Sequence, residues 1–239
     1  MGKIFVVGIG PGDVKHMTNK AKDVLEQSEV ILGYKTYIDL IKAHYPTKKM
    51  ISFPMRSEVE RCKLTIEKAK EHSHVSIISS GDAGVYGMAG ILLEIADHET
   101  IEVVPGMTAI QAAGASLGAP IMHDYVSISL SDLLTDWSVI EKRLELAAKG
   151  DFVTCLYNPK SKTRTTQIQK ARNIFIENDG NDKIVGIVKN AKRKNEQVYI
   201  TTVEKMLDFP IDMSTIVIIG NDSTYVKNNY MITKRGYDI

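Results

Sequence analysis

Three glycine-bearing turns constrain the fold of this 239-residue chain more than any other feature. Each turn follows a short, mainly apolar stretch of the kind typical of strands buried on both faces. The stretches cover residues 4–7, 75–78 and 101–104, and the turns begin at Gly8, Gly81 and Pro105. Strands of one parallel sheet end at the same edge, so we expect the three turns to converge there.

The rest of the chain alternates strands with helices, which predicts an α/β fold. Further strands are expected at residues 30–32, 126–130, 152–157, 183–188, 197–201 and 215–219. Helices are expected from Thr18 and over residues 36–44, 57–72, 88–96, 108–118, 138–149 and 163–177. The later strands are closely spaced with few helices between them, which predicts a mixed sheet in the second half.

Local signals refine these boundaries. Ser57 with Glu60, and Ser138 with Glu141, have the spacing of capping boxes that open helices. Gly150 is placed to end the helix that Ser138 would open. The run Gly118-Ala119-Pro120 interrupts the alternation and predicts a linker, so we expect two domains, residues 1–118 and 119–239.

The first turn partly matches the glycine fingerprint of dinucleotide-binding folds. Gly8 and Gly10 fit the first two glycines, but Asp13 occupies the place of the third. A carboxylate there would oppose a pyrophosphate at a helix N-terminus, and Pro11 removes a backbone donor. A nicotinamide or flavin site is therefore disfavoured, and a tight turn without a ligand remains an alternative.

The second and third turns carry polar side chains. Asp82 comes just after a buried strand, where a carboxylate suits a ribose hydroxyl, an amine or a cation. Alternatively, Asp82 caps the following helix, and both roles remain open. Thr108 in the third turn by itself favours a helix N-cap. The convergence of three such turns strengthens the interpretation as a ligand site.

Composition excludes several classes of protein. The 30 Lys and Arg against 29 Asp and Glu give a net charge of +1, without the basic excess of most nucleic-acid binders. Cys62 and Cys155 cannot form a disulfide framework, a structural zinc site or an iron–sulfur site. The sequence shows neither a signal peptide nor an apolar run of about 18 residues, so we expect a cytoplasmic protein.

Taken together, the turns resemble the tetrapyrrole (corrin and porphyrin) methylases, a family of S-adenosylmethionine-dependent enzymes. The segments that carry this resemblance are VGIGPGD at 7–13, SGDAGVYG at 80–87 and VVPGMTA at 103–109. The second half is similar to the branch that methylates carbon 17 of precorrin-3B, through HDY at 123–125, SLSDLLT at 129–135, IEKRL at 140–144, LYNP at 156–159, TIVIIGN at 215–221 and MITKRGY at 231–237. Asp136 and Lys234 depart from this pattern, which has proline at both places.

The resemblance implies two α/β domains with S-adenosylmethionine in a cleft between them, a homodimer and no metal. It implies C-methylation of precorrin-3B or cobalt-precorrin-3 at carbon 17, with ring contraction, in cobalamin biosynthesis. The residues implied to contact the cofactor are Gly10, Pro11, Gly12, Gly81, Asp82, Val85, Tyr86, Thr108, Ala109, Leu156, Tyr157, Ala191 and Gly220.

Ring contraction needs proton transfers, and the substrate of this branch is a polycarboxylate. The candidates for proton transfer are His123, Asp124, Asp132 and Tyr157, although a structural role is favoured for each. The candidates for binding carboxylates are Arg143, Lys160, Lys162, Arg164, Arg193 and Arg235, with a solvated surface charge as the alternative. Alternative functions are a methylase of the same superfold acting on another tetrapyrrole, a diphthamide precursor or ribosomal RNA, and a non-catalytic nucleotide-binding protein.

Overall fold

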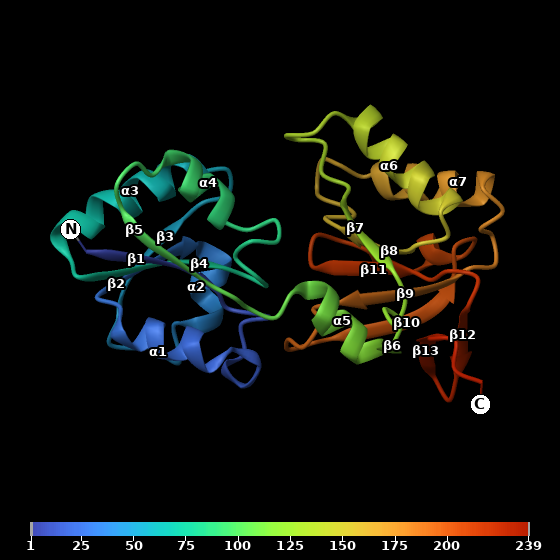
Figure 1. Ribbon diagram of the computed structural model, residues 1–239, viewed down its shortest axis with the longest axis horizontal. Helices are drawn as coiled ribbons and strands as arrows, with labels where there is room; N and C mark the ends of the chain where they lie inside the picture. Colours follow the sequence, from blue (N-terminus) through green and yellow to red (C-terminus); the bar gives the residue numbers. More distant parts are fainter. Residues whose placement is uncertain (1, 239) are drawn as a thin grey trace. The chain divides into compact units, whose positions relative to one another are not determined.

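A computed structural model describes residues 2–238 of the chain. The chain divides into two compact units, Met1–Ala109 and Ile110–Ile239 (Figure 1). Sequence patterning places the linker nine residues later, after Gly118. The difference is the helix α5 (Ala109–Leu117), whose Leu117 packs against Gly186 in the second unit.

The first unit contains a five-stranded parallel sheet in the order β3-β2-β4-β1-β5. Its strands are β1 (Lys3–Gly8), β2 (Val30–Tyr34), β3 (Lys49–Phe53), β4 (His74–Ser79) and β5 (Thr100–Val104). Its helices are α1 (Asn19–Gln27), α2 (Lys35–Ile41), α3 (Glu58–Glu71) and α4 (Ala89–Ile95), with a 3-10 turn at Val14–His16. The sequence predicted all of these strands except β3, whose alternating polar residues hide it.

Helices cover both faces of this sheet because alternate strand residues face opposite ways. Ile4 and Val6 of β1 pack with α3 and α4 on one face. Phe5 and Val7 pack with α1 and α2 on the other. The strands are therefore buried on both faces, as their continuous apolar runs predict.

The second unit contains a mixed sheet in the order β10-β9-β11-β8-β7. Its strands are β7 (Tyr125–Ser129), β8 (Val153–Tyr157), β9 (Ile184–Lys189), β10 (Gln197–Thr202) and β11 (Thr215–Ile219). Only β7 and β8 pair in parallel, and the remaining pairs are antiparallel, which confirms the expected mixed sheet.

One face of the mixed sheet packs against α6 (Trp137–Lys149) and α7 (Gln167–Glu177), followed by a 3-10 turn at Met206–Asp208. The second unit also contains a small three-stranded sheet, which was not predicted and whose first strand directly follows α5. Its strands are β6 (Gly118–Ala119), β12 (Thr224–Lys227) and β13 (Tyr230–Thr233). The predicted linker at Gly118 and Ala119 is thus a short strand that pairs with β13.

Both predicted capping boxes are absent. Ser57 precedes α3, but its backbone (φ −114°, ψ 33°) lies outside the extended region of an N-cap, and its side chain makes no capping bond. Helix α6 begins one residue before Ser138, because Trp137 joins the helix and packs against the core. Gly150 does end α6, as expected.

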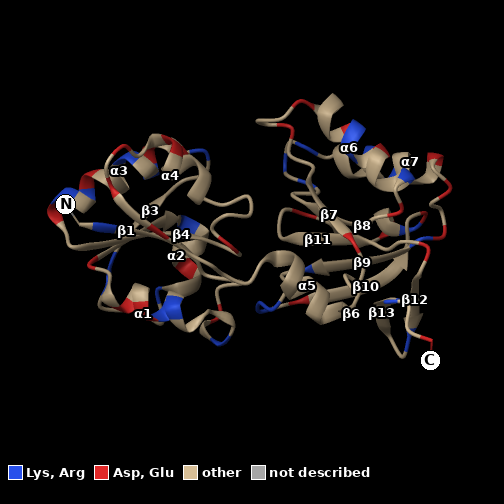
Figure 2. Ribbon diagram, in the orientation of Figure 1, with Lys and Arg blue, Asp and Glu red and all other residues tan. Residues whose placement is uncertain are grey.

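Charges of both signs are interspersed in each unit (Figure 2). Within residues 2–238, no helix is long and apolar enough to cross a membrane. Cys62 and Cys155 are both free and buried.

Candidate functional site

The three glycine-bearing turns lie at one edge of the parallel sheet, as the sequence predicted. They follow β1, β4 and β5, and β1 lies between the other two strands. The chain leaves β1 toward helix α1 on one face and leaves β4 toward α4 on the other. Adjacent strands whose connections diverge in this way form the crevice where open α/β sheets bind ligands.

Backbone hydrogen bonds join the first turn to the second. Gly10 and Gly81 each donate an N–H to the other's carbonyl, at 3.0 and 2.7 Å. Gly10 (φ +60°) and Gly81 (φ +72°) have left-handed backbones that favour glycine. The two turns therefore form one rigid strip of main chain.

The third turn packs against this strip so closely that no side-chain atom fits between their main chains. A Cβ atom added at Gly106 would lie 2.3 Å from the Gly81 carbonyl oxygen and 2.5 Å from that of Gly8. One added at Gly8 would lie 2.7 Å from the Gly106 nitrogen. Sequence reasoning missed this role of Gly8 and Gly106, although the Pro-Gly pair after a strand signals a tight turn.

Asp82 connects the second and third turns. Its Oδ2 accepts the Gly106 N–H at 2.9 Å, and its Oδ1 accepts the Gly84 N–H at 2.8 Å. The helix-cap interpretation of Asp82 is wrong, because α4 begins only at Ala89. Each carboxylate oxygen accepts more than one hydrogen bond, and the side chain is half-buried, so Asp82 retains acceptor capacity for a ligand.

The other first-unit candidates surround Asp82. Val85 and Tyr86 are exposed beside it, Tyr86 with a left-handed backbone (φ +53°). Thr108 and Ala109 are half-buried where the third turn enters α5. Asp13, which argued against a dinucleotide, instead caps the 3-10 turn by accepting the Lys15 N–H at 2.9 Å.

The second unit brings together only some of the predicted residues. Leu156 is fully buried at the end of β8, where Tyr157 follows it, and Ala191 comes two residues after β9, which runs in the same direction. The Tyr157 hydroxyl accepts the Ile110 N–H at 3.4 Å. Gly220 lies at the opposite edge, because β11 is antiparallel to β8 and β9. Its N–H donates to the Ile184 carbonyl at the start of β9. This edge lies about 14 Å along the strands from Tyr157 at the end of β8.

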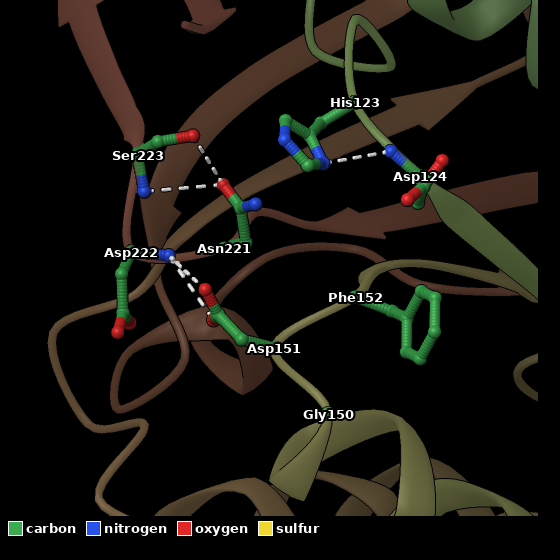
Figure 3. Close-up of a pocket in the computed structure, with 8 residues that line it drawn as sticks. All are labelled: His123, Asp124, Gly150, Asp151, Phe152, Asn221, Asp222 and Ser223. Atoms are coloured by element: carbon green, nitrogen blue, oxygen red, sulfur yellow. Dashed lines mark hydrogen bonds between the residues drawn. The ribbon is translucent and has the colours of Figure 1, made fainter. Parts of the chain in front are cut away.

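The four proton-transfer candidates are divided in the same way. Asp132 lies after β7 and Tyr157 is the last residue of β8, whereas His123 and Asp124 lie before β7. The latter two line a cavity of about 510 Å³ at the Gly220 edge (Figure 3). Its other lining residues are Gly150, Asp151, Phe152, Asn221, Asp222 and Ser223. The four side chains therefore do not form one constellation.

Among the predicted carboxylate-binding cations, Arg164 has a structural role. Its guanidinium donates to the Leu130 and Asn158 carbonyls at 3.0 and 2.5 Å and lies 3.9 Å from Asp132. Burial lowers its pKa, and Asp132 opposes that shift. Its donors hold together the loops that follow β7 and β8.

The other predicted cations differ in exposure. Lys162 and Arg143 are exposed, and Arg143 lies on α6. Lys160 and Arg193 are half-buried in loops after β8 and β9. Arg235 is exposed and donates to the Met122 carbonyl at 3.4 Å.

Comparisons with known proteins agree with this architecture. Residues 3–207 match the family model "Tetrapyrrole (Corrin/Porphyrin) Methylases". A protein of Salmonella typhimurium named "Probable cobalt-factor III C(17)-methyltransferase" is 47% identical, over 99% of this chain and 100% of its own. Other curated relatives are longer, and the chain spans about half the length of some of them.

Solved structures share the fold. A crystal structure of the methyltransferase CobJ superposes with a TM-score of 0.90 at 32% identity, over 98% of this chain and 100% of that one. Uroporphyrin-III C-methyltransferase from Thermus thermophilus, complexed with S-adenosyl homocysteine, has a TM-score of 0.70 at 20% identity, over 92% of this chain and 97% of that one. The chain belongs to the tetrapyrrole (corrin/porphyrin) methylases.

Proposed function

We propose that the protein is an S-adenosylmethionine-dependent methyltransferase that methylates carbon 17 of cobalt-factor III, with contraction of the macrocycle, in cobalamin biosynthesis. The observation that carries this proposal is the 47% identity with the Salmonella protein of that name over the whole of both chains. The likeness to CobJ at 32% identity supports the same branch. The relative's name favours the cobalt-containing substrate over metal-free precorrin-3B.

The edge around Asp82 fits the cofactor. Asp82 retains acceptor capacity for hydroxyl or ammonium groups, which would form charge-assisted hydrogen bonds with it. Beside it, a Cβ at Gly84 would meet only Asp82 Oδ1 at 3.3 Å, so the main chain at Gly84 is accessible to a ligand. The proposed first-unit contacts are Gly10, Pro11, Gly12, Gly81, Asp82, Val85, Tyr86, Thr108 and Ala109.

In the second unit, Leu156, Tyr157 and Ala191 remain candidates for the cofactor. Gly220 is not retained, because it lies at the other edge of its sheet. The polycarboxylate substrate would meet cations of this unit, of which Arg164 is the least suited, because its guanidinium already donates to the Leu130 and Asn158 carbonyls. Lys160 and Arg193 remain candidates.

The chemistry requires little of the side chains beyond positioning. The cofactor supplies a methyl group on a cationic sulfur, and the sulfur leaves as a neutral thioether, so no general acid is needed. Holding the two reacting carbon atoms in attack geometry contributes up to about 7–11 kcal/mol. The rigid strip formed by the first two turns is suited to this task, because two main-chain hydrogen bonds between Gly10 and Gly81 hold it in place.

The family resemblance also implies a homodimer, which light scattering after size-exclusion chromatography tests, and the cytoplasm remains the expected location. The activity is tested by incubating the protein with labelled S-adenosylmethionine and cobalt-factor III. Mass spectrometry should show the gain of one methyl group. Label transfer to ribosomal RNA or to a diphthamide precursor instead would establish a competing function, and no transfer to any acceptor would contradict the proposal.

The cofactor site is tested separately by calorimetry with S-adenosylhomocysteine. Replacing Asp82 by Asn removes the charge at nearly constant volume and also loses one of the two hydrogen bonds from the Gly84 and Gly106 N–H groups, because an amide has a single acceptor oxygen. Loss of a charged hydrogen bond, worth about 1.5–3 kcal/mol, should weaken binding about 10- to 150-fold. The control is Asp23→Asn, an exposed carboxylate on α1. Equal affinity of Asp82→Asn and wild type would exclude this contact.

A further inference from the structure

Arg61 is a fully buried cation that has no acidic partner. It lies in the first half of α3 and is 2% exposed. Its Nη1 donates to the Met88 sulfur at 3.3 Å, and its Nη2 to the Pro54 carbonyl at 3.5 Å. Its Nε has no hydrogen-bond partner. Within residues 2–238, no carboxylate forms an ion pair with it.

This arrangement is unfavourable for stability. A thioether is a weak acceptor, and the 3.5 Å contact is at the limit of a hydrogen bond. The Phe53 ring face, 5.7 Å from the guanidinium carbon, adds a modest attraction. Burial lowers the pKa of Arg61, and Glu58 opposes this only through space. An apolar side chain of similar length would be at least as stable here.

Arg61 lies at the same edge of the sheet as Asp82. Pro54, which it contacts, follows β3, and Met88 follows the second glycine-bearing turn. Strands β3 and β4 are parallel, so both contacts belong to the ligand edge. The guanidinium therefore lies at this edge of the sheet, between the loop after β3 and the end of the second glycine-bearing turn.

The loop over Arg61, residues 54–57, is weakly held. Arg56 has a left-handed backbone (φ +66°), which is strained for a residue other than glycine. Met55 is 60% exposed, and Ser57 makes no capping bond. Displacing this loop would sacrifice little packing and would release Nη2 from the Pro54 carbonyl.

We propose that Arg61 binds a carboxylate side chain of the tetrapyrrole substrate, which reaches it when residues 54–57 move aside. This inference rests on the proposed function, because it requires a polycarboxylate substrate. The Nε and Nη2 donors form one edge of the guanidinium fork and match the two oxygens of a carboxylate. One of these donors is unpaired and the other is held only by Pro54, so a carboxylate would satisfy both.

The test compares Arg61→Met, Arg61→Lys and the control Lys63→Met, an exposed lysine on the same helix. The measurements are direct absorbance titration with cobalt-factor III in the presence of S-adenosylhomocysteine, KM for both substrates, and thermal unfolding. Arg61→Met should weaken tetrapyrrole binding and raise its KM about 10- to 100-fold. Its S-adenosylhomocysteine affinity should stay within about twofold of wild type, and its unfolding midpoint should be unchanged or higher.

The conservative variant separates charge from shape. Arg61→Lys keeps a cation without the fork, so its tetrapyrrole affinity should fall between those of wild type and Arg61→Met. The proposal is overturned if Arg61→Met binds cobalt-factor III as tightly as wild type. It is also overturned if this variant loses stability and S-adenosylhomocysteine affinity together, since that pattern identifies a structural arginine. Wild-type binding of cobalt-factor III without turnover would refute the proposed function but leave this proposal standing.

Discussion

Replacing Gly106 by Ala tests whether main-chain crowding holds the three turns together. The added Cβ would lie 2.3 Å from Gly81 O, 2.5 Å from Gly8 O and 2.6 Å from Gly8 C. All three obstacles are backbone atoms, so no side-chain rotation relieves the overlap. Relief requires the ends of β1 and β4 to move, which also lengthens the hydrogen bond from the Gly106 N–H to Asp82.

The magnitude follows from these two effects. Overpacking that shifts backbone costs about 1–3 kcal/mol, and weakening a hydrogen bond to a charged group about 1.5–3 kcal/mol. We expect a loss of about 4 kcal/mol in the unfolding free energy of the first unit. With a urea m-value of about 2 kcal/mol per molar, the midpoint falls by about 2 M.

Circular dichroism and fluorescence locate the effect. Trp137 is the single tryptophan and lies on α6 in the second unit, so its fluorescence reports that unit, whereas circular dichroism reports both. The shift should appear in circular dichroism and leave the Trp137 midpoint unchanged. The control is Gly90→Ala on α4, where an added Cβ meets nothing within 4 Å. It should stabilise by up to about 1 kcal/mol, because alanine favours helix.

A midpoint for Gly106→Ala within about 0.3 M of wild type would refute the reasoning, because that difference is close to the uncertainty of the measurement. It would mean that the turns accommodate a side chain and are not locked main chain to main chain. A fall in the Trp137 midpoint equal to that in circular dichroism would also count against it, since the strain would not be local to the first unit.

Two further predictions concern titratable groups. Burial raises the pKa of Cys62 to about 11 and that of Cys155 to about 12, so neither thiol should react with Ellman's reagent at pH 8 until urea exposes both. Burial alone would raise the pKa of Asp212, but hydrogen bonds from Lys189 and Ser214 lower it from 3.8 to about 2. The stabilisation by ionised Asp212 is therefore complete above about pH 4 and is lost as the pH falls toward 2. In Asp212→Asn, the urea midpoint should depend less on pH over that interval.

The sequence predicted most of the strands and the convergence of the three turns. These follow from apolar runs and from the common direction of parallel strands. The position of Gly220 could not be predicted, because an apolar run such as that of β11 does not indicate whether the strand is parallel or antiparallel to its neighbours. Only the pairing of β11 with β8 shows that its end lies opposite Tyr157.

Arg61 was missed for a related reason. It lies among charged residues in a helix whose pattern predicts an amphipathic surface, where an arginine is normally solvated. Its burial depends on Phe53 and Pro54 at the end of β3 and on Met88 before α4, two segments that are distant in the sequence. The spacing of one helix contains no information about such a contact.

The crowding at Gly8 and Gly106, together with the left-handed backbone of Gly81 (φ +72°), has a consequence for how related sequences diverge. A side chain at Gly8 or Gly106 cannot be accommodated by a second substitution, because each obstacle is a main-chain atom, and a second substitution does not relieve the backbone strain that a side chain at Gly81 would add. We therefore expect the three positions to resist sequence drift together, whatever acceptor a related enzyme methylates. The most recognisable segments of such chains would then mark their common ancestry, while the information that distinguishes one acceptor from another would accumulate at less conspicuous positions.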